Sequence, residues 1–160
     1  MPLKEYKRKR DFRKTPEPPP ELTPKMYSEI SRYYKIPEER PIYVVQKHAA
    51  TRLHWDLRLE FAGVLRSWAV TKEPKMDTTI RRLAIATENH PLEYGSFSGI
   101  ISEGYGAGTV EIWDNGTFET IKDEKGKIIV DIKGKKLRGR FALIKTAFSQ
   151  RSWLFFKMKE

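Results

Sequence analysis

The chain of 160 residues contains no cysteine, which excludes disulfide bonds and metal sites made of thiolates. No apolar run approaches the roughly 18 residues that a membrane-spanning helix needs, so we expect no membrane association. The amino-terminal MPLKEYKRKRDFRK is charged, but no apolar stretch follows it, so it lacks the pattern of a secretory signal. A reducing, cytoplasmic location is therefore expected.

Positive charge is the strongest feature of the composition. The 31 Lys and Arg residues exceed the 21 Asp and Glu residues and give a net charge of +10. Residues 1–14 hold seven basic and two acidic side chains, and further basic runs lie at Arg81, Arg82 and 133–140. Such concentrated charge attracts polyanions, so it favours nucleic acid as a partner over a merely solvated surface.

The first 22 residues have the composition of an arm. Pro16 and the run 18–20 favour an extended polyproline conformation after the charged start. The remaining residues, 23–160, suit a single domain with a sizeable core.

A helix over about 24–35 is predicted to open this domain. Thr23 can cap it and Pro24 suits its first position, while Pro37 ends it. Its apolar residues recur at helical spacing: Met26, Tyr27, Ile30, Tyr33 and Tyr34.

From Pro41 onward the apolar period changes to two, which predicts strands. The candidates are 42–47, 53–61, 64–71, 83–87, 108–113, 117–121, 128–133, 138–145 and 153–158. Asn115–Gly116 predicts a two-residue hairpin, and the glycine-rich stretch 95–108 predicts a long loop. Many short strands after one helix indicate a mainly β fold, a closed or nearly closed antiparallel barrel.

One segment combines an apolar face with a reactive one. His54, Asp56 and Arg58 alternate with apolar residues in LHWDLRLEF, and side chains on a strand alternate between its two faces. His48 ends the preceding candidate strand, so pairing of the two strands would bring it to His54 and Asp56. Imidazole and carboxylate together suit a divalent manganese, zinc or iron ion, with positions left open for water and substrate.

Further polar residues could complete a phosphate pocket beside such an ion. Arg58 follows on the same face, Gln46 shares the face of His48, and Lys72 ends a neighbouring strand. His90, in ENHPLEY with Tyr94, could be a fourth ligand, a general acid or a phosphate contact. The glycine stretch GYGAG fits neither a dinucleotide-binding motif nor a P-loop.

Three ordered motifs resemble the 3′-phosphoesterase domain of bacterial and archaeal DNA ligase D. They are YVVQKHAATRLHWDLRLEFAGVLRSWAVTKEP, ENHPLEY and EGYGAGTVEIWDNGTFE. The resemblance runs from about Arg10 to about Lys157. The arm's RDFRKTPEP is similar to the family's amino-terminal segment and places Arg10, Asp11 and Glu17 at its functional positions.

The resemblance implies a compact β-barrel enzyme that heals DNA 3′ ends during non-homologous end joining. Family members use manganese to remove a terminal ribonucleoside and then hydrolyse the remaining 3′-phosphate to a hydroxyl; Co²⁺ or Zn²⁺ are alternative ions. The metal ligands of the family resemble His48, His54 and Asp56, and its phosphate-binding and catalytic residues resemble Arg58, His90 and Tyr94. Gln46, Lys72 and Arg82 match its supporting positions around the substrate.

The implied partners are a primer–template with a damaged 3′ end, a separate ATP-dependent DNA ligase and other end-joining proteins. We expect a monomer associated with the nucleoid when it acts. The loop SEGYGAG is one residue shorter than the usual family form. No polymerase or ligase domain is attached, and the initial Met favours a free-standing enzyme over an excised domain.

Two alternatives compete with this interpretation. His54 and Asp56 form an HxD element that, with His90, would make the triad of a non-haem Fe(II) oxygenase. A non-catalytic module that binds DNA ends is the other. Loss of function on changing His48 or Asp56 would exclude that second alternative.

Overall fold

The computed structural model describes residues 3–9, 35–101 and 107–160. Its helical elements are α1 (Lys4–Arg8) and the 3-10 helix η1 (Leu92–Ser96). Its strands are β1 (Ile42–Ala49), β2 (Leu53–Phe61), β3 (Val64–Val70), β4 (Arg82–His90), β5 (Gly99–Ile101), β6 (Gly108–Glu124), β7 (Lys127–Lys133), β8 (Arg138–Lys145) and β9 (Ser152–Lys157). Within these ranges, no helix is long and apolar enough to cross a membrane.

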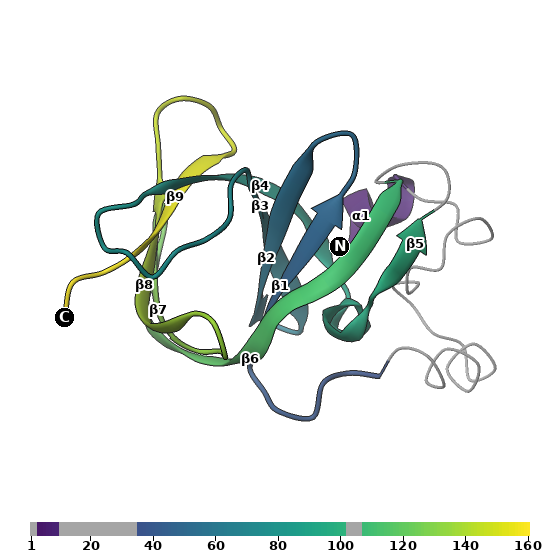
Figure 1. Cartoon of the computed structure of the whole chain (residues 1–160), viewed down its shortest axis with the longest axis horizontal. Coiled ribbons are helices and arrows are strands. Elements are labelled where there is room, and N and C mark those ends of the chain that lie inside the picture. The colour runs from purple at the N-terminus through teal and green to yellow at the C-terminus, as the bar shows by residue number, and fades with distance from the viewer. Residues whose placement is uncertain (1–2, 10–34, 102–106) are drawn as a thin grey trace.

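Eight strands close into an antiparallel barrel. Their order is β1-β2-β3-β4-β9-β8-β7-β6, and pairing of β6 with β1 closes the ring, while β5 adds to β6 outside it (Figure 1). The predicted mainly β, closed barrel is therefore confirmed. The helix predicted over about 24–35 falls outside the described residues except at its end, and so does the proline-rich part of the arm. The sequence analysis did not foresee α1.

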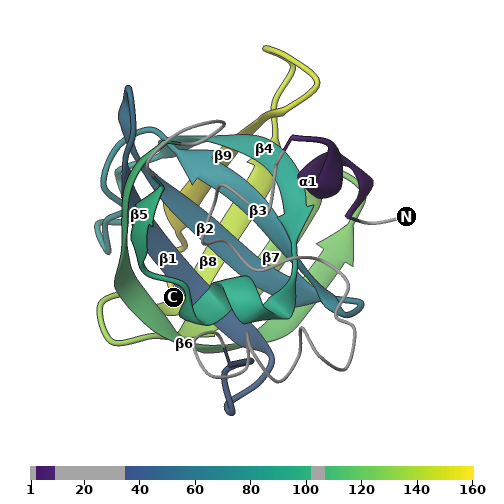
Figure 2. The same cartoon turned by 90° about the vertical axis from the view of Figure 1, so that its right-hand side faces the viewer.

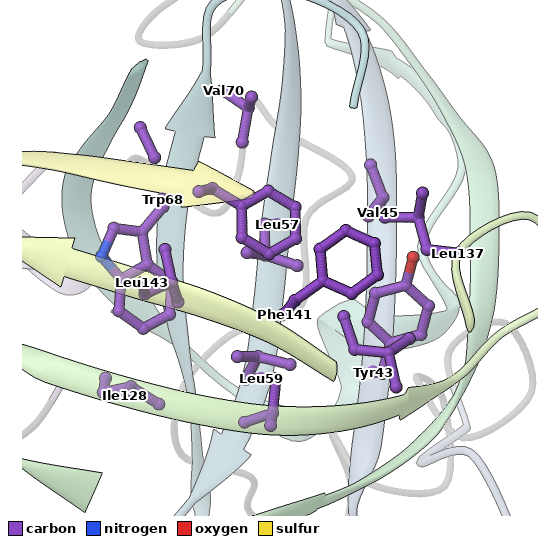
Figure 3. Packing of buried hydrophobic residues seen from close by; sticks show 14 of the residues in the cluster. Tyr43, Val45, Leu57, Leu59, Trp68, Val70, Ile128, Leu137, Phe141 and Leu143 are labelled. Atoms are coloured by element: carbon purple, nitrogen blue, oxygen red, sulfur yellow. The ribbon is translucent and has the colours of Figure 1, made fainter. Parts of the chain in front are cut away.

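The barrel interior is apolar and built by strand alternation. Trp55, Leu57 and Leu59 of β2 point into the interior, whereas Leu53, at the start of the strand, remains 46% exposed. Aromatic rings fill much of the remaining space: Phe141 stacks on Phe155 with centroids 5.0 Å apart. Figure 3 shows the rings and aliphatic side chains meeting from opposite walls. This packing makes the barrel a filled core, not a channel.

A second layer lies on the outside of the barrel wall. Helix η1 contacts β1 and β3, β5 pairs with β6, and α1 lies beside β4 (Figure 2). They contribute to a separate buried cluster: Tyr6, Ile42, Val44, Leu65, Tyr94, Phe97, Ile101 and Val110. His54, Asp56 and Arg58 alternate with the interior residues of β2, so they point toward this second layer. The polar face of β2 therefore lies between the barrel wall and its cover.

The hairpin predicted at Asn115–Gly116 is wrong. Strand β6 continues through both residues, which pair with Val44 and Tyr43 of β1. A Cβ atom at Gly116 would lie 2.1 Å from the carbonyl oxygen of Lys133, so glycine serves a close backbone approach here. The β6–β7 hairpin turns at residues 125–126 instead, where Gly126 has φ +79°.

The long loop predicted over 95–108 is also partly wrong. Residues 92–96 form η1, and β5 pairs with the start of β6, Ile100 opposite Thr109. Strand β5 has only three residues, too few to show an alternating pattern in the sequence. Positions 102–106 lie outside the described residues.

Candidate active site

The β1–β2 hairpin brings three potential metal ligands together. His48 pairs with His54 across the ladder, and Gln46 pairs with Asp56. One ligand atom from each of His48, His54 and Asp56 lies within 4.8 Å of the others. The Asp56 Oδ2 atom is 3.2 Å from His54 Nε2 and 3.6 Å from His48 Nδ1. Two imidazoles and a carboxylate on one side of a hairpin leave room for further ligands of a divalent ion.

The surroundings of this trio suit a metal. His54 Nδ1 lies 2.9 Å from the carbonyl oxygen of Arg52, so a proton on Nδ1 donates there, and Nε2 is the ring nitrogen that faces Asp56. Metal-bound histidines are commonly oriented by such a contact of the second ring nitrogen. His48 and Asp56 are buried, while His54 is half-buried and connects the trio to solvent. The donor set and its orientation therefore fit a divalent cation.

Electrostatics keep the Asp56 carboxylate ionised. Burial by itself raises its pKa, but the charge of Arg58 and the hydrogen bonds of His48 and His54 outweigh burial and hold the pKa well below its usual value. For His54, burial lowers the pKa, yet the hydrogen bond and the negative charge of Asp56 raise it overall. An ionised carboxylate is the form that binds a cation.

Arg58 connects the metal trio to the second layer. Its Nη2 atom is 3.5 Å from Asp56 Oδ2, and its Nε donates to Gln46 Oε1 at 2.6 Å. Gln46 Nε2 donates in turn to the carbonyl oxygens of Tyr94, at 2.7 Å, and Phe97, at 3.0 Å. The guanidinium also lies over the Tyr94 ring, 4.7 Å from its centroid. Gln46 therefore fixes the orientation of a buried positive charge beside Asp56.

His90 lies on the far side of Arg58, at the end of β4. Its Nδ1 atom is 3.1 Å from Arg58 Nη1, 2.9 Å from the Glu88 carbonyl oxygen and 3.4 Å from Ser67 Oγ. Arginine only donates, so its contact requires a lone pair on Nδ1, whereas the carbonyl requires a proton there. The tautomer of His90 therefore decides which of these two hydrogen bonds forms.

Tyr94 and Tyr6 pack around this histidine. The His90 ring centroid lies 4.6 Å from that of Tyr94 and 5.0 Å from that of Tyr6, both in edge-on geometry. Tyr6 comes from α1 and is fully buried. These aromatic contacts restrict the His90 ring. Because Tyr6 belongs to α1, an element of the amino-terminal arm contacts the site.

Among the described residues, no hydrogen bond or ion pair joins Arg82 or Lys72 to this cluster. Arg82 Nε donates to the Glu73 carbonyl oxygen at 2.8 Å, and strand alternation places Arg82 on the barrel-facing side with Ala84. Lys72 is exposed beyond β3 and makes no hydrogen bond or ion pair within the part of the chain that the structure describes. Arg10, Asp11 and Glu17 lie outside that part.

The sequence analysis missed Glu88. Its carboxylate is buried, with Oε2 3.2 Å from Lys9 Nζ and Oε1 3.9 Å from His90 Nε2. The sequence did indicate that Glu88 belongs near His90, because it stands two positions earlier on one strand and side chains at that spacing share a face. The contact with Lys9, 79 residues away, carried no such signal.

Comparison with known proteins identifies the family of the chain. A family model described as the DNA ligase D 3′-phosphoesterase domain matches residues 46–145, which include every member of the cluster from Gln46 to Tyr94. The chain belongs to this family. The multifunctional non-homologous end joining protein LigD of Pseudomonas aeruginosa is 44% identical over 167 aligned residues, covering 99% of this chain. The corresponding LigD proteins of Mycobacterium tuberculosis and Mycolicibacterium smegmatis are each 43% identical, covering 98% and 99% of the chain.

The resemblance noted from the sequence is thus confirmed, and it extends over nearly the whole chain. The chain spans about a fifth of the length of these curated relatives, 19–21%. The family model describes the matched stretch as the 3′-phosphoesterase domain.

Proposed function

We propose that this DNA ligase D-type domain is a metal-dependent phosphoesterase that heals DNA 3′ ends. It removes a 3′-terminal ribonucleoside and then the resulting 3′-phosphate, leaving the 3′-hydroxyl that end joining requires. The observation that carries the proposal is the juxtaposition of the His48–His54–Asp56 trio with the buried, Gln46-oriented guanidinium of Arg58. A metal ligand set and a fixed cation side by side form a place for one phosphate group.

The metal would be held by His48, His54 and Asp56. Mn²⁺ is our proposed ion, with Co²⁺ or Zn²⁺ as alternatives, because imidazole and carboxylate ligands suit all three. Bound there, such an ion would supply Lewis-acid stabilisation of phosphate charge and a lowered pKa for a bound water.

The protein's own groups position the phosphate. The guanidinium of Arg58 would donate to two phosphate oxygens and stabilise charge that spreads over them during transfer. In doing so Arg58 would release His90 Nδ1, which lies 3.1 Å from its Nη1. His90 would then donate to the phosphate or to the leaving oxygen. Tyr94, packed against both, would hydrogen-bond the phosphate through its hydroxyl.

The names of the relatives indicate the setting. They are described as proteins of non-homologous end joining, so we propose a primer–template with a 3′-phosphate or a 3′-terminal ribonucleotide as substrate. A separate ATP-dependent ligase and other end-joining proteins would act on the healed end. We further propose that the domain acts as a monomer in the cytoplasm, at the nucleoid.

Neither alternative is favoured by the geometry. The triad predicted for the oxygenase had His90 as its third ligand, whereas among the described residues His48 joins His54 and Asp56. His90 instead lies against Arg58, Ser67 and Glu88. A module that only binds DNA ends would have no use for a ligand trio beside a buried guanidinium.

The test is phosphate release from a 3′-phosphate primer–template with Mn²⁺, compared between wild type and His54→Ala. We expect release by wild type and none by the variant, with thermal unfolding at a similar temperature in metal-free buffer. Activity of His54→Ala equal to that of wild type would reject the proposal. Turnover of 2-oxoglutarate with Fe(II), without phosphate release, would favour the oxygenase.

A further inference from the structure

Tyr6 is one of the largest side chains that the protein buries completely, although it belongs to α1, a helix of only five residues. So short a helix is not stable by itself, and tertiary contacts must hold it in place. The ion pair between Glu5 and Arg151, at 3.4 Å, joins two exposed side chains and contributes little. The burial of Tyr6 is therefore a main attachment of α1 to the rest of the protein.

Tyr6 is buried against two residues of the site. Its ring centroid lies 5.0 Å from that of His90, at an interplanar angle of 69°, and 6.2 Å from that of Tyr94, at 89°. The centroids of His90 and Tyr94 are themselves 4.6 Å apart, at 73°. Three aromatic rings thus contact one another edge-on, which is a favourable geometry for aromatic pairs. Helix α1 contacts β4, the strand that ends at His90 (Figure 2).

The orientation of the His90 ring depends on packing as well as on hydrogen bonds. The torsion that turns an imidazole has broad energy wells, so polar contacts at one ring nitrogen leave the ring room to turn. The contacts of His90 Nδ1 with Arg58 and with the Glu88 carbonyl oxygen also require opposite proton positions. Tyr6 and Tyr94 limit this movement, because each places a ring against the imidazole.

A fixed ring matters for the role that we propose for His90. A hydrogen bond weakens steeply as its angle departs from linearity, so a donor must be aimed at the oxygen that receives its proton. A displacement of about 1 Å at a reacting group can reduce the rate about a hundredfold. A side chain that holds the His90 ring therefore contributes to the rate through His90.

We propose that Tyr6 is a positioning residue of the active site, whose ring holds His90 in the direction that proton donation requires. The inference rests on the proposed function, because it takes His90 as the donor to the phosphate or to the leaving oxygen. The aromatic ring of Tyr6 is the part that acts, since its contacts with His90 and Tyr94 are ring contacts. Loss of this ring lowers kcat and leaves KM nearly unchanged, because the metal ligands and Arg58 still bind the phosphate.

The experiment compares wild type with Tyr6→Leu, Tyr6→Phe and Ile101→Ala. Tyr6→Leu keeps an apolar side chain in the pocket, so α1 stays attached while the ring is lost. Ile101→Ala is the matched control: Ile101 belongs to the same buried cluster and is 2% exposed, but it lies on β5, which pairs with β6.

Two measurements are made on each protein, and thermal unfolding checks the folding of all four. Phosphate release from a 3′-phosphate primer–template with Mn²⁺ gives kcat and KM. NMR of the imidazole protons in metal-free protein reports on the His90 ring independently of activity. The chain contains three histidines, so their resonances are readily assigned.

We expect Tyr6→Leu to lower kcat by about tenfold to a hundredfold and to keep KM within about threefold of wild type. Its His90 resonances should move, because a neighbouring ring is lost, while those of His48 and His54 stay in place. Tyr6→Phe should restore both kcat and the His90 resonances, since it keeps the ring. Ile101→Ala should change neither, although it lowers the unfolding temperature.

Several outcomes would overturn the proposal. Tyr6→Leu with the kcat of wild type, or with unmoved His90 resonances, would show that the ring does not position His90. Tyr6→Phe as slow as Tyr6→Leu would assign the role to the hydroxyl instead of the ring. An equal loss of kcat in Ile101→Ala would mean that the buried cluster acts only through stability. If wild type releases no phosphate, the proposed function fails, while the His90 resonances still decide whether Tyr6 holds that ring.

Discussion

At the scale of single residues, Arg58 shows how one side chain is committed in several directions. Its Nε is bound to Gln46, its Nη1 reaches His90 and its Nη2 faces Asp56. A lysine has one ammonium group and cannot reproduce these directions at once. Its pocket is also buried, so an ammonium placed there would lose hydration without full compensation.

We therefore expect Arg58→Lys to reduce kcat by about a hundredfold or more while Mn²⁺ affinity changes little. The kinetic constants on a 3′-phosphate primer–template and calorimetric titration with Mn²⁺ measure the two effects separately. Arg66→Lys is the matched control, because Arg66 lies on the neighbouring strand β3 with a half-exposed pairing to Asp123. Retained activity of Arg58→Lys would show that a point charge suffices at this position.

His54 gives the site a pH dependence with a definite sign. Its pKa is raised above the usual 6.5, so a proton occupies Nε2 at pH values where a free histidine is neutral. A proton and a metal compete for this lone pair, so Mn²⁺ affinity should fall as pH decreases through the raised pKa. Asp56 contributes no change in this window because its pKa is lowered and it stays ionised.

Calorimetric titration with Mn²⁺ between about pH 5 and pH 8 measures this dependence. The heat should also reveal about one proton released per ion at the acidic end. An affinity independent of pH over this window would mean that His54 does not ligate the metal.

Much of the site was predictable at this scale, for a physical reason. His48, His54 and Asp56 lie within two paired strands, so alternation and pairing suffice to bring them together. Glu88 and Tyr6 were missed because their roles depend on α1 packing against β4, and no local pattern reports a contact between such distant parts of the chain.

At the scale of elements, apolar periodicity predicted most strands. The prediction failed at Gly116, because a glycine can indicate either a turn or a close backbone approach within a strand. Asn–Gly is typical of a tight hairpin, yet Gly116 lies in mid-strand against the Lys133 carbonyl. Helix α1 escaped notice because five residues cannot form a stable isolated helix and depend on tertiary packing, here through the buried Tyr6.

The close approach at Gly116 predicts a large loss of stability on substitution. Gly116→Ala would force the β6 and β7 backbones apart, since its Cβ would lie 2.1 Å from an oxygen atom. We expect a loss of about 2–3 kcal/mol in the free energy of unfolding, measured by urea denaturation.

Gly63→Ala is the comparison for Gly116→Ala. Gly63 has φ +82° with open space around it, so only backbone strain opposes a side chain there. We expect Gly63→Ala to lower the free energy of unfolding by about 1 kcal/mol. Equal losses for the two variants would mean that β7 moves aside at Gly116 without cost.

At the scale of the whole molecule, the net charge of +10 predicts salt-dependent binding of DNA. Each phosphate neutralised by a Lys or Arg releases counterions, so affinity falls as salt rises. We expect at least about a tenfold loss of affinity for duplex DNA between about 50 and 200 mM salt.

Fluorescence anisotropy across this range measures the slope of affinity against salt. Replacing Lys135 and Lys136, both exposed, by glutamine should reduce the slope only if the basic run 133–140 contacts DNA. A flat dependence on salt in wild type would contradict an electrostatic encounter altogether.

The sequence predicted the closed barrel, because many alternating strands have few other ways to hide their edges. It did not predict that the reactive face would lie on the outside of the wall beneath a second layer. Alternation tells which side chains share a face, but the choice between interior and exterior depends on strand order and on the elements that cover them.

The ligand trio belongs to one hairpin, and this bears on the order of assembly. Arg58 and Gln46 are 12 positions apart, whereas Tyr43 and Asp114, which join β1 to β6 where the ring closes, are 71 apart. Short loops close with less loss of chain entropy and therefore sooner. We therefore expect the hairpin that carries the ligand trio to form before the barrel closes, and an ion bound at that stage would stabilise it.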